Sequence, residues 1–126
     1  MKTTTEIGRY GESVAIAHLK ANKYKILEQN YFASHNEIDI IAENKQYIVF
    51  VEVKARSCSS PDDMAFGTPA TAVTYAKQKR TITAAQAYLN DHKTKKIPRL
   101  DVIEVYLSRE TNEVIKINHI ENAFCA

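Results

Sequence analysis

The chain of 126 residues is poor in glycine and cysteine, and both shortages exclude classes of site. Its three glycines do not form the glycine-rich loop that cradles nucleotide phosphates. Its two cysteines, Cys58 and Cys125, have no metal-ligand spacing and are too few for a disulfide framework. A reducing compartment such as the cytoplasm therefore fits the sequence.

Long apolar segments and a strong net charge are missing as well. No apolar run approaches the roughly 18 to 20 residues that a membrane-spanning helix needs, and the Thr-rich residues 1–8 do not resemble a signal peptide. We therefore expect a cytoplasmic protein with no membrane partner. The formal net charge of +2 is too small to indicate a nucleic-acid binder by itself, so any basic surface must be local.

Two further kinds of catalytic machinery find no support. The four histidines show no metal-ligand spacing, and the serines follow no nucleophile-elbow pattern. Any hydrolytic chemistry in this chain is therefore expected to be metal-assisted.

Length and periodicity predict a single α/β domain over residues 1–126. Capping signals and apolar periodicity give the order helix, three strands, helix, two strands. Residues 55–69 hold two of the three prolines and predict a long mobile loop that can close over a substrate. The expected helices run from the cap residue Thr3 to about residue 22 and over 70–90, and the expected strands are 24–32, 37–43, 46–54, 98–107 and 114–120.

Three charged residues share one face of the second and third expected strands. Alternation places Glu52 and Lys54 on one side of the third strand and Asp39 on the corresponding side of the second. A two-residue turn at 44–45 would put Asp39 opposite Phe50 and diagonal to Glu52, at roughly 7 to 8 Å between backbones. Both carboxylates would then reach one ion.

These acids favour a divalent cation, because burial and like charge both oppose ionisation beside apolar strand residues. Hard oxygen ligands at this spacing suit Mg²⁺ or Mn²⁺, with the backbone carbonyl of Val53 and several waters completing the shell. For a single acid, a solvated position on an exposed sheet face is the commoner explanation. The joint pattern favours the metal, because Ile41, Ile48 and Phe50 would make an unusual solvent-facing surface.

The first helix adds a third acid. Glu12 lies on the apolar stripe that runs through Ala15 and Leu19 rather than on the polar face. The same helix carries Gly8 and Gly11, each costing about 1 kcal/mol relative to alanine. Close approach of another backbone or a ligand would explain these glycines, and so would a frayed helix start.

The second helix supplies an amide and several cations. Gln78 points inward, in register with Ile82. Lys77, Lys79 and Arg80 place three positive charges in the N-terminal half of this helix, where phosphates can bind. A solvated basic face is the commoner explanation of such a run.

Several motifs match those of one protein family. At the expected site they are Gly11-Glu12, Glu37-Ile38-Asp39-Ile40-Ile41-Ala42 and Phe50-Val51-Glu52-Val53-Lys54-Ala55-Arg56. Beyond it they are Lys77-Gln78, Tyr88-Leu89, Arg99-Leu100-Asp101-Val102-Ile103 and His119-Ile120-Glu121-Asn122-Ala123-Phe124. Together they resemble the bacterial YraN-like family of uncharacterised proteins, over roughly residues 8–124.

That family is similar to the restriction-endonuclease-like superfamily, with its signature of Asp, then Asp or Glu, any residue, Lys, and most nearly to archaeal Holliday junction resolvases. The resemblance implies one restriction-endonuclease-like domain with an αβββαβ core and a mixed central sheet flanked by helices. Ile38 stands where the strict signature has proline. The matched positions are Asp39 and Glu52 for the acids, Lys54 for the lysine, Glu12 for the helix-borne acid and Gln78 for a helix glutamine.

The resemblance further implies a Mg²⁺- or Mn²⁺-dependent nuclease that hydrolyses phosphodiester bonds, in DNA more than in RNA, with structured or branched DNA as one substrate class. Lys77, Lys79, Arg80 and Arg56 would bind the nucleic-acid backbone. Junction resolution would require a homodimer that presents two sites. Two alternatives stay open, namely a non-catalytic nucleic-acid-binding module that retains the fold and an interaction protein whose acids are structural.

Overall fold

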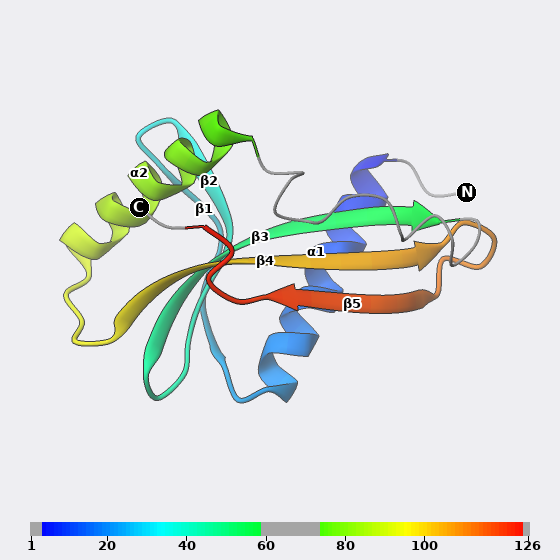
Figure 1. Cartoon of the computed structure of the whole chain (residues 1–126), viewed down its shortest axis with the longest axis horizontal. Coiled ribbons are helices and arrows are strands. Elements are labelled where there is room, and N and C mark those ends of the chain that lie inside the picture. Colours follow the sequence, from blue (N-terminus) through cyan, green and yellow to red (C-terminus); the bar gives the residue numbers. More distant parts are fainter. Residues whose placement is uncertain (1–3, 59–73, 125–126) are drawn as a thin grey trace.

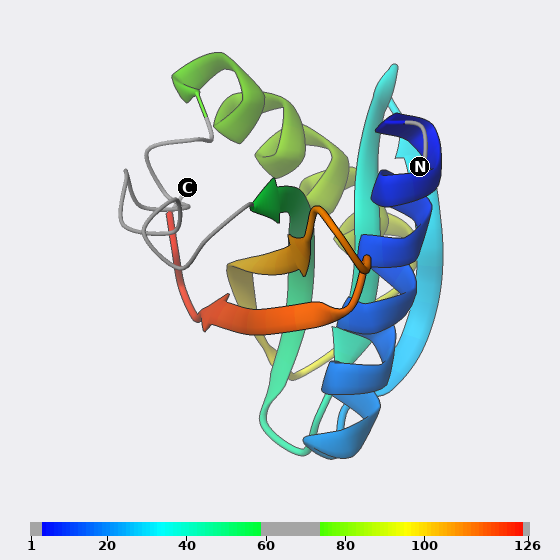
Figure 2. The ribbon, with the colours of Figure 1, turned by 90° about the vertical axis from the view of Figure 1, so that its right-hand side faces the viewer.

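Two helices lie on opposite faces of one twisted, five-stranded sheet (Figures 1 and 2). The computed structural model describes residues 4–58 and 74–124. The result is the predicted α/β domain with an αβββαβ core, to which a further strand adds one edge. The elements are α1 (Thr4–Ala21), β1 (Lys25–Ala33), β2 (Asn36–Glu43), β3 (Tyr47–Cys58), α2 (Tyr75–Asp91), β4 (Ile97–Ser108) and β5 (Val114–Ile120).

The sheet is mixed, as predicted, with the strand order β1-β2-β3-β4-β5. Its central pair, β3 and β4, runs parallel, whereas the other neighbours are antiparallel. A parallel pair needs a crossover connection, and α2 lies on that crossover. The helix therefore covers one face of the sheet and leaves the other to α1 (Figure 2).

The α1 face is closed by Ala15 and Leu19, which are both fully buried. The predicted apolar stripe of this helix is thus confirmed, while the predicted cap Thr3 lies outside the described residues. Within the described chain, no helix is long and apolar enough to cross a membrane. The strands contribute Tyr24, Ile40, Ala42, Val49, Val51, Ile103, Val105 and Leu107 to this core.

The α2 face is closed by Ala84, Ala85 and Tyr88. The helix begins after Thr74, whose hydroxyl accepts a hydrogen bond from the Lys77 amide at 3.1 Å. We expected a start at residue 70, and the intervening residues lie outside the described ones. The strands and the C-terminal end contribute Ile38, Ile41, Ile48, Phe50, Leu100, Val102 and Phe124 to this core, so the predicted apolar face does not meet solvent.

Strand β3 is longer than predicted. We expected it to end at Lys54 and residues 55–69 to form a loop, but the strand continues through Cys58. Parallel β4 pairs with β3 along this whole length and supplies its backbone hydrogen bonds. The apolar pattern of β3 alone does not show how far this pairing extends. Arg56 consequently stands on a strand, and residues 59–69 lie outside the described part of the chain.

The turn of the β2–β3 hairpin also differs from the prediction, because it is centred on Lys45 and Gln46. The side-chain oxygen of Asn44 accepts hydrogen bonds from the amides of Gln46 and Tyr47 at 2.9 and 2.7 Å. An asparagine that bonds the amides after it in this way fixes the turn locally. The predicted turn at 44–45 was therefore wrong by one position.

This turn shifts the strand pairing by two residues. Ile41, rather than Asp39, stands opposite Phe50. An even shift preserves the alternation of faces along the paired residues. Asp39 lies one residue beyond the last pair, Ile40 and Val51, and close enough to Glu52 for its charge to raise the pKa of that acid.

Candidate functional site

Asp39 lies where β2 and β3 separate. The regular pairing of the two strands ends at Ile40 and Val51. Beyond that point, Asp39 Oδ2 accepts a hydrogen bond from the backbone amide of Val53 at 2.8 Å. The carboxylate replaces the backbone carbonyl that would accept this bond in a regular sheet. Asp39 is thereby held against β3 at Val53, the residue after Glu52.

The backbone around Asp39 departs from a regular sheet. On the neighbouring strand β1, Asn30 has a φ of 50°, in the left-handed region. Ile38 packs on the α2 side of the sheet while Ile40 packs on the α1 side, so the alternation of β2 is interrupted at Asp39. Irregularities of this kind recur next to functional sites because they redirect a side chain.

Glu52 is buried on the α2 side of β3, with 5% of its surface exposed. Its Oε1 lies 3.7 Å from the Nζ atoms of both Lys54 and Lys77. Its Oε2 is buried and has no hydrogen-bond partner among the described residues. Oε1 is therefore shared by two ammonium groups at a loose distance, and Oε2 has no donor within the described chain.

Burial leaves both acids reluctant to ionise. Burial, reinforced by the charge of Asp39, raises the pKa of Glu52 to about 7, against the opposing effect of Lys77 and Lys54. Burial also raises the pKa of Asp39, although the Val53 amide and Lys77 pull it down. The site thus holds two carboxyl groups whose negative charge is incompletely balanced.

Gly11 allows α1 to approach β3 closely. A Cβ atom placed on Gly11 would lie 2.6 Å from Cβ of Ala55, which is too close for two carbon atoms, whereas one on Gly8 would meet nothing within 4 Å. Close approach therefore explains Gly11 and not Gly8. The contact positions Glu12, the next residue of the helix, at the α1 edge of the site.

Glu12 is half-buried, and its pKa is raised by burial and by the nearby charges of Asp39 and Glu37, with Arg9 opposing. With its amide nitrogen facing the acids, Asn30 donates hydrogen bonds to Oε1 of Glu12 at 2.9 Å and Oε1 of Glu37 at 3.0 Å. The sequence analysis missed Asn30, because a single polar residue in an edge strand carries no signal. Its role follows from the left-handed backbone that turns it toward the acids.

Two of the three predicted carboxylate ligands form the centre of the site, Asp39 and Glu52. Across the described residues, no three His, Cys, Asp or Glu side chains gather closely enough to hold a metal by themselves. The predicted set with Glu12 is therefore not assembled as a three-acid cluster. Two carboxylates with backbone and water oxygens are nevertheless a common Mg²⁺ shell, and the part of the Val53 carbonyl in it stays a prediction.

The predicted cations of α2 divide into two groups. Lys77 lies inside the site, because its Nζ reaches Glu52. Lys79 and Arg80 are exposed, and Nζ of Lys79 lies over the ring of Tyr75 at 4.7 Å from its centre. The helix therefore offers one lysine to the buried acid and two further cations to solvent.

Gln78 and Arg56 belong to the two elements that carry Lys77 and Lys54, α2 and β3. Gln78 is half-buried in the first turn of α2. Arg56, two residues past Lys54, donates from Nε to Oε2 of Glu104 at 2.9 Å. The sequence analysis missed Glu104, although an acid between apolar neighbours in strand β4 is a signal of a buried charge.

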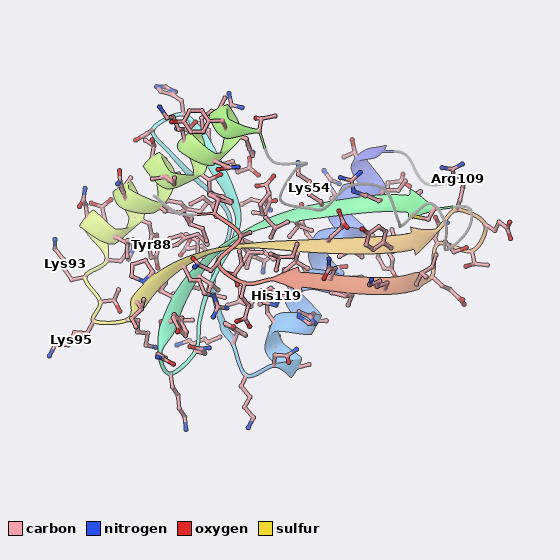
Figure 3. The ribbon with its side chains drawn as sticks, viewed as in Figure 1. Lys54, Tyr88, Lys93, Lys95, Arg109 and His119 are labelled. Atoms are coloured by element: carbon pink, nitrogen blue, oxygen red, sulfur yellow. The ribbon has the colours of Figure 1, made fainter. Side chains whose placement is uncertain are left out.

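A second buried carboxylate, Asp101, lies on β4 away from these residues and is fully buried. It accepts hydrogen bonds from Nε and Nη2 of Arg99 at 2.9 and 2.8 Å, from Nε2 of His119 at 2.8 Å and from the Asn122 amide at 3.0 Å. Burial alone would raise the pKa of Asp101, but these donors outweigh it and hold the pKa below its usual value. Through Asn122, the network ties the residues that follow β5 to the sheet. His119, on β5 itself, is labelled in Figure 3.

Fold and site together define a class of protein, a single-domain α/β protein whose mixed sheet carries a buried acid and a half-buried acid beside two lysines. The chain belongs to the uncharacterised protein family UPF0102, whose profile matches residues 11–105. This confirms the YraN-like resemblance found in the sequence.

Relatives in several bacteria cover almost the whole chain. A UPF0102 protein of Caldanaerobacter subterraneus subsp. tengcongensis is 44% identical over 119 residues, which are 94% of this chain and 93% of the relative. One of Clostridioides difficile is 43% identical over 120 residues, covering 94% and 96%. One of Alkaliphilus oremlandii is 45% identical over 122 residues, covering 94% and 97%. The chain and these relatives thus share one domain of nearly the same length.

Proposed function

We propose that this chain is a Mg²⁺- or Mn²⁺-dependent nuclease that hydrolyses phosphodiester bonds in DNA. The observation that carries the proposal is the pair of buried Glu52 and half-buried Asp39, whose charges are incompletely balanced. If Glu52 were purely structural, its buried Oε2 would be expected to have a donor, and none is present among the described residues. Perturbed acids of this kind concentrate at functional sites, and the resemblance to restriction-endonuclease-like proteins supports the same reading.

The residues fit a hard divalent cation. Glu52 Oε2 is a buried oxygen that needs a positive partner, and Asp39 keeps its Oδ1 free of any hydrogen bond to the described residues. These two carboxylates, the Val53 carbonyl and water would hold the ion, with Glu12 as an outer acid. An ion bound there would supply polarisation of a phosphoryl oxygen and a more acidic water.

The chain's own residues supply positioning and charge. Lys54 is partly exposed and lies 3.7 Å from Glu52 Oε1, between the buried acid and solvent. Its ammonium group can orient the attacking water and offset the negative charge that develops on the phosphoryl oxygens. Lys77 balances the acids from the helix side, where Gln78 can orient a phosphate or Lys54. Lys79, Arg80 and Arg56 would bind the flanking backbone.

A cleavage panel tests this proposal. Purified protein is incubated with single-stranded, duplex and branched DNA and with RNA, in Mg²⁺, Mn²⁺ or EDTA. We expect metal-dependent cleavage that falls by roughly 100-fold or more in Asp39→Asn, Glu52→Gln and Lys54→Gln. Exposed Glu113→Gln and Lys95→Gln serve as charge-matched controls with wild-type activity. Cleavage that survives all three site substitutions would contradict the assignment.

Substrate and assembly rest on the resemblance alone. It favours DNA over RNA and includes branched DNA, and the panel ranks these substrates directly. A junction-resolving activity would need a homodimer, which sizing of the protein in solution detects. An enzyme of this kind would work in the cytoplasm, in keeping with the two cysteines of the chain, which are too few for a disulfide framework.

A non-catalytic nucleic-acid-binding module is the second candidate. It is favoured by the two lysines on Glu52, which partly balance its charge without any ion. This candidate predicts binding that weakens steeply with salt and no cleavage in any metal. Absence of both metal and nucleic-acid binding would instead favour an interaction protein.

A further inference from the structure

An ion pair with one buried partner lies next to the candidate site. Arg56 on β3 donates from Nε to Oε2 of Glu104 on β4 at 2.9 Å. The two side chains differ sharply in exposure, at 44% for Arg56 and 2% for Glu104. The acid is therefore an internal anchor, while the guanidinium lies at the surface.

The contact leaves most of the guanidinium available. Arginine has five N–H donors in a planar fork. Only the Nε donor of Arg56 has a partner among the described residues. The Nη1 and Nη2 atoms, whose geometry matches two oxygens of one phosphate, have no partner in that part of the chain, and the bond at Nε orients them.

The anchor itself is not explained by packing. Oε1 of Glu104 is buried without a hydrogen-bond partner in the described residues. A structural ion pair would be expected to satisfy both oxygens, for example by a two-point contact with the guanidinium. The observed one-point contact gives up that bond and leaves the outer donors of Arg56 without a partner in residues 4–58 and 74–124.

The pair lies on the same face of the sheet as the candidate site. Glu52, Lys54 and Arg56 alternate along β3 toward the α2 side, and Lys54 is the direct neighbour of Glu104 in the parallel pairing. Residues two apart on a strand are separated by about 6.7 Å, which is close to the separation of neighbouring phosphates along one nucleic-acid strand. Lys54 and Arg56 are thus spaced to contact two neighbouring phosphates of one strand.

We propose that Arg56 is the binding site for an adjacent phosphate of a nucleic-acid strand and that Glu104 is the positioning residue that orients it. The inference rests on the proposed function, because it assumes that a nucleic-acid strand crosses this face. It adds the path of the substrate, in which the nucleic-acid strand runs along β3 from Glu52 to Arg56.

The substitution Glu104→Gln separates positioning from charge. It removes a negative charge beside a phosphate site, so charge alone predicts tighter binding of nucleic acid. Loss of the anchor predicts the opposite, because Arg56 must then be ordered on binding. We expect binding about three- to tenfold weaker, measured by fluorescence anisotropy with labelled single-stranded and duplex DNA in EDTA, where no cleavage occurs.

Arg56→Gln and Lys95→Gln form a matched pair, since each removes one exposed cation. Lys95 lies at the end of the α2–β4 connection, far from Lys54 in Figure 3. We expect Arg56→Gln to reduce the slope of log affinity against log salt by about 0.9 for duplex and about 0.7 for single strands, and Lys95→Gln to leave it unchanged. Adding Glu104→Gln to Arg56→Gln should weaken binding no further.

Arg56→Lys covers the case in which Arg56→Gln fails to fold, because it keeps a cation beside buried Glu104. It should retain the salt slope and lose affinity several-fold. Tighter or unchanged binding by Glu104→Gln would overturn the positioning role, and so would equal behaviour of Arg56→Gln and Lys95→Gln. Wild-type protein that binds no DNA at any salt concentration would overturn both this inference and the proposed function. If the wild type binds and cleaves DNA but the Glu104 and Arg56 variants behave otherwise than expected, only this inference is contradicted and the proposed function stands.

Discussion

Two carboxylates of this domain, Asp101 and Glu52, are almost equally buried and have opposite surroundings. Asp101 accepts four hydrogen bonds, two of them from Arg99, and its pKa is lowered. Glu52 has one oxygen at 3.7 Å from two lysines and the other without a donor in the described chain, and its pKa is raised to about 7.

The difference shows that burial alone does not identify a functional acid. A fully bonded buried carboxylate has its negative charge balanced by fixed donors, so it holds neighbouring segments together. An incompletely bonded one retains capacity for a further positive partner, at a cost to stability. By this criterion Asp101 is structural, and Glu52 belongs to a binding site.

The largest expected effect is on stability, in Asp101→Asn. The substitution leaves the buried guanidinium of Arg99 with exposed Glu121 as its remaining acidic partner, so we expect a loss of about 3–5 kcal/mol in the free energy of unfolding. Urea unfolding at neutral pH measures it. Glu52→Gln should be neutral or stabilising under the same conditions, and equal destabilisation by both substitutions would break the comparison.

The pH dependence of stability should also distinguish the two acids. The pKa of Glu52 is about 7 in the folded protein against 4.5 as its ordinary value. Between these values the folded state binds more protons than the unfolded chain, so this group lowers the free energy of unfolding as pH rises through that window. Relative to Glu52→Gln, the wild type should lose up to about 3 kcal/mol between pH 4.5 and pH 8. A constant difference between the two proteins across this range would refute the raised pKa.

Asp101 contributes with the opposite sign. Its pKa is lowered in the folded state, so its stabilising contribution is present above its ordinary pKa and is lost as pH falls through the lowered one. Acid unfolding of the wild type should therefore begin at a pH where Glu52 is already protonated.

The approach of α1 to the site is tested by the two helical glycines. Gly11→Ala places a Cβ 2.6 Å from that of Ala55, and we expect it to destabilise the protein by about 1–3 kcal/mol through overpacking. Gly8→Ala has open space around it and should stabilise the helix by up to about 1 kcal/mol. Thermal unfolding of both variants provides the measurement, and similar shifts would remove the case for a tight α1–β3 contact.

A smaller effect is expected from magnesium. If Asp39 and Glu52 bind the ion, Mg²⁺ at ten times its dissociation constant should stabilise the folded wild type by about 1.4 kcal/mol. The gain should grow as pH rises through 7, because the ion must displace a proton from Glu52. Calorimetric unfolding with and without Mg²⁺ checks both statements. Glu52→Gln should lose the gain, and a gain that persists in it would place the ion elsewhere.

Much of the fold was predictable from local patterns. The order of helices and strands, the buried stripe of α1 and the last strand, Val114–Ile120, follow from periodicity over a few residues. The shared face of Glu52 and Lys54 on β3 was predictable for the same reason. Asp39 lies where the alternation of β2 is interrupted, and its hydrogen bond from the Val53 amide holds it at the site.

The amino-acid sequence by itself determined which residues can face one another, because alternation and helical pitch are local properties of the chain. The tertiary structure alone decided how well each charge is balanced. Parallel pairing of β4 with the end of β3 brings Glu104 behind Arg56, the irregular backbone at Asn30 turns its amide toward Glu12, and α2 delivers Lys77 to Glu52. These contacts join segments far apart in the chain, and no short-range pattern encodes them.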